Sequence, residues 1–268
     1  MEIRHESLIG TFEEKKALVD KFNLMDDDFF SVVMRDKKAC SYTLSKLLEK
    51  DLTVIEVKTQ YAVRNIEGHS VILDALAEDT EHKMYNIEIQ VKNDDYHPKR
   101  VRYYQASLDT LLLEKNSNYK ELPELYLIFI SAKDWIKGGR CKYTVKRILA
   151  ETEQELDNGV HELYFNAAVN DNSFLSELLS YFKNSSADNN NFGELSRAVY
   201  YHKRISEGVD SMCQAVKDYG DKREIQGKIE GKIEGKLEIV KKLISRGTPL
   251  DDALEIAEID KETFERNK

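Results

Sequence analysis

Two strand patterns followed by a helix and a third strand pattern constrain the fold of this chain most. Alternating and apolar residues predict strands over 70–77 and 84–92, which a polar loop at 78–83 joins. A helix is predicted over 98–113, and the apolar run within 122–131 (LPELYLIFIS) is typical of a buried strand. Because a helix separates two strand patterns, we expect a crossover connection and an α/β fold.

The composition narrows the classes of protein that remain. The chain has 268 residues, of which 41% are hydrophobic and 33% charged, and its mean hydropathy of −0.56 indicates a soluble globular protein. No run of about 18 apolar residues is present, which excludes a membrane span, and the first residues lack the apolar segment of a secretory signal. Three cysteines without a CxxC pair argue against a disulfide framework and predict a reducing, cytoplasmic location.

The charge is distributed unevenly along the chain. A net charge of −9 excludes a uniformly basic nucleic-acid-binding protein. Between Lys92 and Arg147, however, 12 Lys and Arg stand against 7 Asp and Glu, an excess of +5, so that the remainder carries −14. We therefore expect a polyanionic partner to contact the middle of the chain.

The sequence divides by pattern into three regions. The strand patterns lie in the first 184 residues, so a core is expected over 1–184. The polar, low-complexity stretch over 185–191 (SSADNNN) is predicted to be a linker or loop. Helical patterns resume at Phe192, and a helical tail is expected over 192–268.

The tail contains a tetrapeptide that is repeated three times over 227–238 as GKIE, GKIE and GKLE. At helical spacing, Ile229, Ile233 and Leu237 form a narrow apolar stripe. Each interior glycine costs roughly 1 kcal/mol relative to alanine, so the isolated helix is expected to be marginal. Two interpretations stay open, namely a solvated, flexible helix and an arm through which the chain forms a homo-oligomer.

Two carboxylates are predicted to meet across the hairpin. Asp74 interrupts an otherwise apolar strand, and Glu88 shares one face of the next strand with Asn86, Gln90 and Lys92. A hairpin folded at residue 81 places Asp74 opposite Glu88, with Cβ atoms roughly 5 Å apart. Two carboxylates at that distance repel each other unless a cation joins them or one is protonated, and Mg²⁺ prefers such oxygen ligands.

A simpler interpretation of the same residues stays open. Glu88 and Gln90 could lie on the solvated face of an ordinary antiparallel hairpin, without any bound ion. Asp74 speaks against this alternative, because a charge inside an apolar strand is costly without a partner.

The same residues resemble a known family. Asp, a hairpin and then Glu-x-Lys form the signature of PD-(D/E)XK nucleases, and this chain resembles their Rpn (recombination-promoting nuclease) branch, the PD-(D/E)XK family transposases. The stretches that carry the resemblance are, in order, LMDDDFF at 24–30, SVILD at 70–74, YNIEIQ at 85–90, PKRVRYY at 98–104 with Asp109, and LPELYLIFI at 122–130. The GKIE repeat is also similar to the C-terminal tail of this group.

The resemblance implies a restriction-endonuclease-like core, which is a mixed sheet flanked by helices. It also implies that Asp74 and Glu88 are catalytic and bind a metal ion. Gln90 stands where most of these nucleases have a catalytic lysine; glutamine occurs there in this branch, and it can orient a water molecule without supplying a positive charge. Lys92, two residues further on the same face, is a candidate to replace part of that charge.

The helix after the hairpin supplies candidate substrate-binding residues. Arg100 and Tyr104 are four residues apart and share a face, whereas Arg102 points elsewhere on the same helix. Arg100 is expected either to contact a phosphate near the metal or to pair with a nearby Asp. A basic segment follows, which is expected to contact the DNA backbone or to be a solvated face; its residues are Lys133, Lys137, Arg140, Lys142, Lys146 and Arg147, interleaved with Trp135 and Tyr143.

These observations lead to one function and one alternative. We expect a DNA endonuclease that depends on Mg²⁺, or on Mn²⁺ or Ca²⁺, and that is associated with recombination or mobile elements. DNA is the expected partner, and no membrane is involved. The alternative is a degenerate nuclease fold that binds DNA or protein without cutting, which Gln90 and the net charge of −9 favour.

Overall fold

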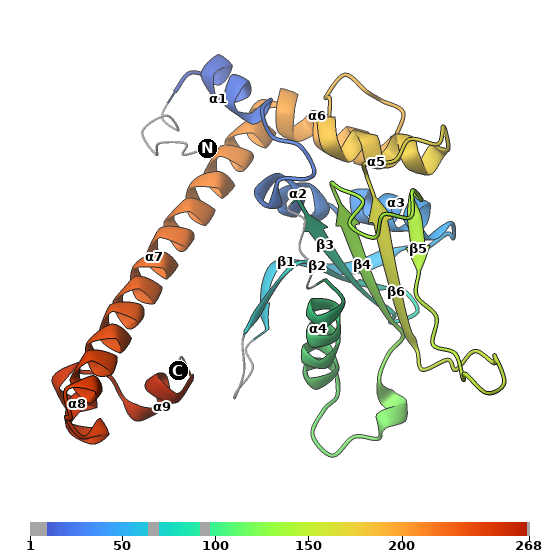
Figure 1. Ribbon diagram of the computed structural model, residues 1–268. Coiled ribbons are helices and arrows are strands. Elements are labelled where there is room, and N and C mark those ends of the chain that lie inside the picture. Colours follow the sequence, from blue (N-terminus) through green and yellow to red (C-terminus); the bar gives the residue numbers. More distant parts are fainter. Residues whose placement is uncertain (1–9, 64–69, 92–96, 267–268) are drawn as a thin grey trace.

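The protein folds around a mixed six-stranded sheet (Figure 1). The computed structural model describes residues 10–63, 70–91 and 97–266. Across the sheet, the strands follow the order β1 (Val54–Val63), β2 (Val71–Asp79), β3 (Met84–Gln90), β4 (Leu125–Ser131), β6 (Val160–Asn166) and β5 (Lys142–Thr144). The helices are α1 (Phe12–Val19), α2 (Asp27–Met34), α3 (Lys37–Leu48), α4 (His97–Leu112), α5 (Phe174–Asn184), α6 (Gly193–Arg204), α7 (Ser206–Ser245), α8 (Leu250–Ile256) and α9 (Lys261–Arg266), with a 3₁₀ turn at Tyr119–Glu121.

The strand directions confirm the expected crossover. β1, β2 and β3 are antiparallel neighbours, whereas β3, β4 and β6 run parallel, and α4 connects β3 to β4. The predicted strands over 70–77, 84–92 and 122–131 and the helix over 98–113 match β2, β3, β4 and α4 to within three residues at each end. No pattern predicts β5, because three residues are too few to show an alternation. The mixed sheet flanked by helices confirms the predicted α/β fold.

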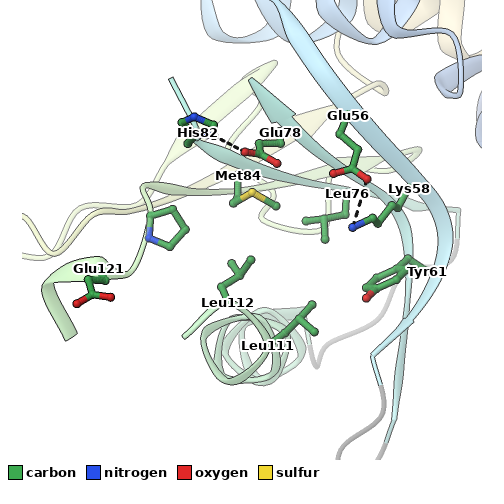
Figure 2. A pocket seen from close by; sticks show the side chains of 11 residues that line it. Glu56, Lys58, Tyr61, Leu76, Glu78, His82, Met84, Leu111, Leu112 and Glu121 are labelled. Atoms are coloured by element: carbon green, nitrogen blue, oxygen red, sulfur yellow. Dashed lines mark hydrogen bonds and ion pairs between the residues drawn. The ribbon is translucent and has the colours of Figure 1, made fainter. Parts of the chain in front are cut away.

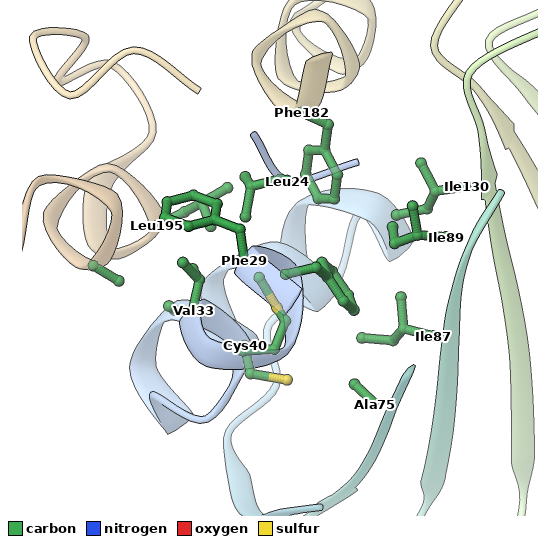
Figure 3. Packing of buried hydrophobic residues seen from close by; sticks show 14 of the residues in the cluster. Leu24, Phe29, Val33, Cys40, Ala75, Ile87, Ile89, Ile130, Phe182 and Leu195 are labelled. Atoms are coloured by element: carbon green, nitrogen blue, oxygen red, sulfur yellow. The ribbon is translucent and has the colours of Figure 1, made fainter. Parts of the chain in front are cut away.

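The two faces of the sheet carry separate hydrophobic clusters. On one face, Ile87 and Ile89 of β3 pack against Phe29 of α2 and other apolar side chains from α2, α3 and α5 (Figure 3). On the other face, Leu108 of α4 belongs to a cluster with Leu127 of β4. Because consecutive strand residues point to opposite faces, β4 is apolar on both sides, which explains its unbroken apolar sequence. We call the side of the sheet that α2, α3 and α5 cover the α3 face, and the side that α4 covers the α4 face.

The main hydrophobic cluster extends beyond the loop predicted over 185–191. Phe192 is buried in the same cluster as α2 and α3, and the cluster continues through α6 and along α7 to Tyr219. Ser185 is buried, and its hydroxyl accepts a hydrogen bond from the Leu24 N–H at 2.8 Å. The segment 185–191 is therefore a loop, and the first part of the predicted tail packs with the core.

The C-terminal part of the chain forms a small cluster of its own. α7 is a 40-residue helix that extends away from the sheet and ends beside α8 and α9 (Figure 1). Leu237 and Val240 of α7 are buried there with Leu254 of α8 and Phe264 of α9. None of the helices in the described ranges is both long and apolar enough to cross a membrane.

Candidate active site

Asp74 on β2 and Glu88 on β3 come together across the hairpin. The antiparallel ladder is recorded from Glu78 opposite Met84 to Ala75 opposite Ile87, and the same register continued by one residue would place Asp74 opposite Glu88. The N–H of Asp74 donates to Oε1 of Glu88 at 3.3 Å, and the N–H of Ile89 donates to Oδ2 of Asp74 at 2.8 Å. The hairpin register predicted from the sequence is thus confirmed. Each carboxylate is held by a backbone donor of the opposite strand.

Glu88 is a buried acid with an unsatisfied oxygen. Its side chain is only 1% exposed, and Oε2 has no hydrogen-bond partner among the described residues. Burial raises the pKa of Glu88 well above its ordinary value, and the nearby charge of Asp74 raises it further, although Arg100 acts in the opposite direction. The ionised form of Glu88 therefore needs a cation to be stable in this environment.

Arg100 is the cation that lies closest to this pair in the described structure. Its Nη2 is 3.9 Å from Oε2 of Glu88. Nε and Nη2 also donate to the hydroxyl of Tyr104 at 3.0 and 2.8 Å, one helical turn further along α4. Tyr104 is 6% exposed, and its ring lies near that of Phe129. Because the ring is fixed by this packing, its hydroxyl fixes the position of the Arg100 guanidinium. The ion pair that the described structure shows for Arg100 is with Glu88, the candidate metal ligand, which neither expectation included.

The other predicted site residues differ in how close they come to this centre. Gln90 is the last residue of β3, on the same face as Glu88, and its side-chain amide makes no hydrogen bond with any described residue. Arg102 is exposed on another side of α4, and nothing in the described structure brings it to Glu88. Lys92 lies outside the described residues.

Asn86 is a polar neighbour to which the sequence analysis assigned no role. It lies two residues before Glu88 on β3 and therefore points to the same face. Asn86 is fully buried, and neither atom of its amide has a hydrogen-bond partner within the described ranges. The sequence could have pointed to Asn86 through its position on the polar face of an alternating strand, which it shares with Glu88. The Asn86 side chain lowers the pKa of Glu88, so the two buried polar groups also interact with each other.

The predicted basic segment is divided between the two faces of the sheet. Trp135 contacts Tyr164 edge-on, with ring centroids 5.1 Å apart, and both belong to the hydrophobic cluster on the α4 face. Lys142 instead pairs with Glu49 at the end of α3, with an N–O distance of 3.6 Å. Lys133 follows β4 directly beyond Ser131, which is the neighbour of Gln90 in the ladder. Of the described basic residues after β4, Lys133 comes soonest after the ladder partner of Gln90.

A pocket with an acidic rim lies on the α4 face at the other end of the hairpin (Figure 2). Its volume is about 430 Å³. Glu78 lies 2.5 Å from Nδ1 of His82, and Glu56, directly opposite Glu78 on β1, pairs with Lys58 at 3.4 Å. Glu121 adds a third carboxylate to the lining. With three carboxylates against Lys58 and His82, this pocket is electrostatically unfavourable for an anion.

The site fits a divalent cation that keeps part of its water shell. Within the described ranges, no group of three or more His, Cys, Asp and Glu side chains is placed to hold a metal ion. Two adjacent carboxylates are present, however, and Oε2 of Glu88, which accepts no hydrogen bond from a described residue, is an oxygen ligand of the kind that Mg²⁺ prefers. Asp74 and Glu88 would hold such an ion, and water or a substrate oxygen would complete its coordination.

Comparison with known families identifies the chain. A sequence model of the PD-(D/E)XK nuclease family transposases matches residues 29–166. This range runs from α2 to the end of β6 and includes the hairpin, α4 and the basic segment. Neither the curated proteins nor the solved structures contain a match for the chain. Because the matched residues make up just over half of the 268 residues, the protein belongs to the PD-(D/E)XK nuclease family transposases.

Proposed function

We propose that this protein is a divalent-metal-dependent DNA endonuclease whose active site is built on Asp74 and Glu88. The observation that carries the proposal is the buried Glu88 carboxylate, which lies beside a second carboxylate and has one oxygen without a hydrogen bond from a described residue. PD-(D/E)XK nucleases generally use divalent metals. We expect Mg²⁺ to serve here and Mn²⁺ or Ca²⁺ to bind at the same place.

The residues around the carboxylates would divide the work of phosphodiester hydrolysis. A bound divalent cation supplies Lewis acidity to the phosphate and lowers the pKa of an attacking water molecule. Gln90, whose side chain lies on the same face as Glu88, would orient that water through a hydrogen bond. Arg100 would bind a nonbridging phosphate oxygen with the N–H groups that it does not donate to Tyr104.

Positive charge for the DNA backbone would come from the part of the chain that adjoins this site. Arg100 stands beside Glu88, and Lys133 and Trp135 follow the end of β4, the strand next to β3. Arg102 is exposed on α4 and is proposed as an outer phosphate contact, although it does not reach the carboxylates. Gln90 supplies no charge, so we expect Arg100 to take over part of the role of the lysine that is found in most of these nucleases.

Cleavage of supercoiled plasmid DNA by the full-length chain tests the proposal. We expect nicking with Mg²⁺ or Mn²⁺ and none in EDTA. Asp74→Ala and Glu88→Ala should each lower the rate at least about 100-fold, because each removes a ligand of the ion. Glu78→Ala is the matched control, since Glu78 is a carboxylate of the same hairpin that pairs with His82 instead. Equal cleavage by wild type and both site variants would reject the assigned site.

One observation favours the alternative of a binding protein that does not cut. The guanidinium of Arg100 already partly neutralises Glu88 without any ion. If this is the resting state of a degenerate site, calorimetric titration with Mn²⁺ should give no heat above that of Asp74→Asn, while DNA binding persists in EDTA. Metal binding that disappears in Asp74→Asn supports the nuclease.

The cellular setting is proposed from two further observations. Cys40, Cys141 and Cys213 are free and buried, which supports a reducing, cytoplasmic location. The family is described as one of transposases, which supports a link to recombination or mobile elements. Self-association through α7 remains our proposal for the tail, and light scattering of the full-length chain measures it.

A further inference from the structure

A cavity of about 550 Å³ lies on the α3 face, away from the carboxylates. It is bounded by the end of α3, by the outer strands of the sheet and by the irregular segment that follows β5. Its lining includes Tyr126 and His161, together with four cationic side chains. Ligand pockets typically span about 300–1,000 Å³, so the cavity has the size of a site for a small molecule.

An aromatic ladder crosses three strands and ends at this cavity. Tyr85, Tyr126 and His161 occupy one register on β3, β4 and β6. The centroids of Tyr85 and Tyr126 are 4.8 Å apart with planes at 19°, and those of Tyr126 and His161 are 4.3 Å apart at 21°. β5 ends at Thr144, although the Val145 N–H still donates to the Glu162 carbonyl at 3.0 Å, and among the described residues no further ring is recorded against His161. A planar ring that enters the cavity can extend this stack by one step.

The cavity also carries an excess of positive charge. Lys50, Lys142, Lys146 and Arg147 line it, against two carboxylates. Lys142 and Lys146 are already paired with Glu49 and Glu155. Arg147, by contrast, is exposed and forms no ion pair with a described residue. A guanidinium that no described carboxylate pairs with, in the same cavity lining as Tyr126 and His161, matches a ligand that combines a ring with an anionic group.

We propose that this cavity is a second binding site that takes a nucleoside phosphate, with its base stacked on His161 and its phosphate bound by Arg147. The ligand is either a free nucleotide or the terminal nucleotide of a nucleic acid strand, because both present the same ring and phosphate. Stacking on aromatic side chains tolerates every base, since each base has a π face.

This site is separate from the proposed active site. Tyr126 packs with the hydrophobic cluster of the α3 face. Phe129, the ladder partner of Glu88, belongs to the cluster of the α4 face, as does Tyr164, the next residue in that row. The six-stranded sheet therefore stands between the cavity and the carboxylates. Binding here requires neither the metal nor Asp74, so it can be tested without nuclease activity.

Calorimetric titration of the full-length chain in EDTA tests the proposal with two probes, ADP and a 5′-phosphorylated single-stranded tetranucleotide. We expect saturable binding that His161→Ala and Arg147→Ala each weaken about tenfold or more. His161→Phe keeps a ring in the stack and should retain binding, which separates loss of stacking from misfolding. Lys120→Ala, an exposed lysine outside the cavity, is the matched control, and Asp74→Asn should bind like wild type.

Each outcome decides the proposal. Binding of either probe that both alanine variants weaken supports the site, and the tighter probe identifies the source of the nucleotide. Absence of binding by both probes, or binding that both alanine variants leave unchanged, overturns it. Inorganic phosphate that competes as strongly as ADP would also overturn it, because phosphate has no ring to stack.

Discussion

Glu88 is the residue at which the demands of the proposed chemistry and of stability conflict. A carboxylate that is 1% exposed, with one oxygen unpaired, destabilises the folded chain whenever it is ionised. Functional sites commonly retain such unfavourable groups because the chemistry needs them. We therefore expect a neutral residue at position 88 to lower the activity and to raise the stability of the folded chain.

Glu88→Gln should abolish DNA cleavage and raise the stability of the metal-free chain at neutral pH. The amide removes the buried charge and its repulsion from Asp74, which we expect to be worth about 1–3 kcal/mol. Thermal unfolding followed by circular dichroism in EDTA measures the change. Glu78→Gln, at a partly exposed position, is the control and should shift the midpoint little. A lower midpoint for Glu88→Gln than for wild type would contradict this account.

Tyr104 is expected to act through Arg100, since its buried hydroxyl accepts two hydrogen bonds from that guanidinium. Tyr104→Phe should lower kcat/KM about tenfold, which corresponds to the loss of about 1.4 kcal/mol of hydrogen bonding to a charged group. In the background of Arg100→Ala, the same substitution should have no further effect. Tyr103→Phe, at an exposed position of the same helix, is the control. Equal effects of Tyr104→Phe in both backgrounds would assign Tyr104 an independent role.

At the scale of elements, the β2–β3 hairpin is held at its turn by the buried carboxylate of Asp79. Asp79 is 3% exposed and accepts hydrogen bonds from the Tyr85 hydroxyl at 2.6 Å and from the N–H groups of Glu81 and Lys83 at 2.8 and 3.0 Å. Burial alone would raise the pKa of Asp79, but these hydrogen bonds outweigh it, and the pKa is lowered. The turn therefore fixes the register that brings Asp74 opposite Glu88.

The lowered pKa of Asp79 predicts how the stability of the hairpin depends on pH. Because the folded pKa lies below the unfolded value, the stabilisation is present above the unfolded pKa and is lost as the pH falls through the folded pKa. Asp79→Asn should destabilise the chain by about 1–3 kcal/mol at neutral pH, and the deficit should shrink in acid. Urea unfolding at several pH values measures this. A deficit that stays constant down to the acid range would contradict it.

The sequence predicts the elements of this fold better than their contacts. Alternation and apolar runs identify β2, β3 and β4, and the midpoint of the hairpin loop gives the pairing of Asp74 with Glu88. The ion pair of Arg100 with Glu88 was not predicted, because helical spacing shows only which residues share a face of α4. β5 is too short for a periodic signal, and the unpaired state of Asn86 depends on neighbours from other strands.

At the scale of the whole molecule, the tail is divided by its packing. α6 and the first part of α7 contribute Phe192 and Tyr219 to the main cluster, whereas Leu237 belongs to the cluster with α8 and α9. A chain that ends at Asp221 should therefore keep its unfolding midpoint within a few degrees of that of the full-length protein. A chain that ends at Ser185 loses α6 from the core and should fail to unfold cooperatively. Circular dichroism of both truncated chains decides between these expectations, and equal behaviour would refute them.

The glycines of the repeat lie between these two clusters. At Gly227, Gly231 and Gly235, an added Cβ would meet no described atom within 4 Å, so alanine fits at all three positions. Each replacement should stabilise the helix by about 1 kcal/mol without disturbing a contact. Hydrogen exchange of the amides over 224–236 should slow in the triple alanine variant, while that of β4 stays unchanged. Unaltered exchange in the middle of α7 would show that the glycines do not limit its stability.

The position of those glycines has a mechanical consequence. One continuous helix, α7, contributes to two hydrophobic clusters, and its least stable helical turns lie between them. On warming, this middle stretch should fray while both ends are still intact. The helical terminus would then move as a tethered body, and a protease would cleave the chain there first, releasing a folded core that still carries both of the proposed sites.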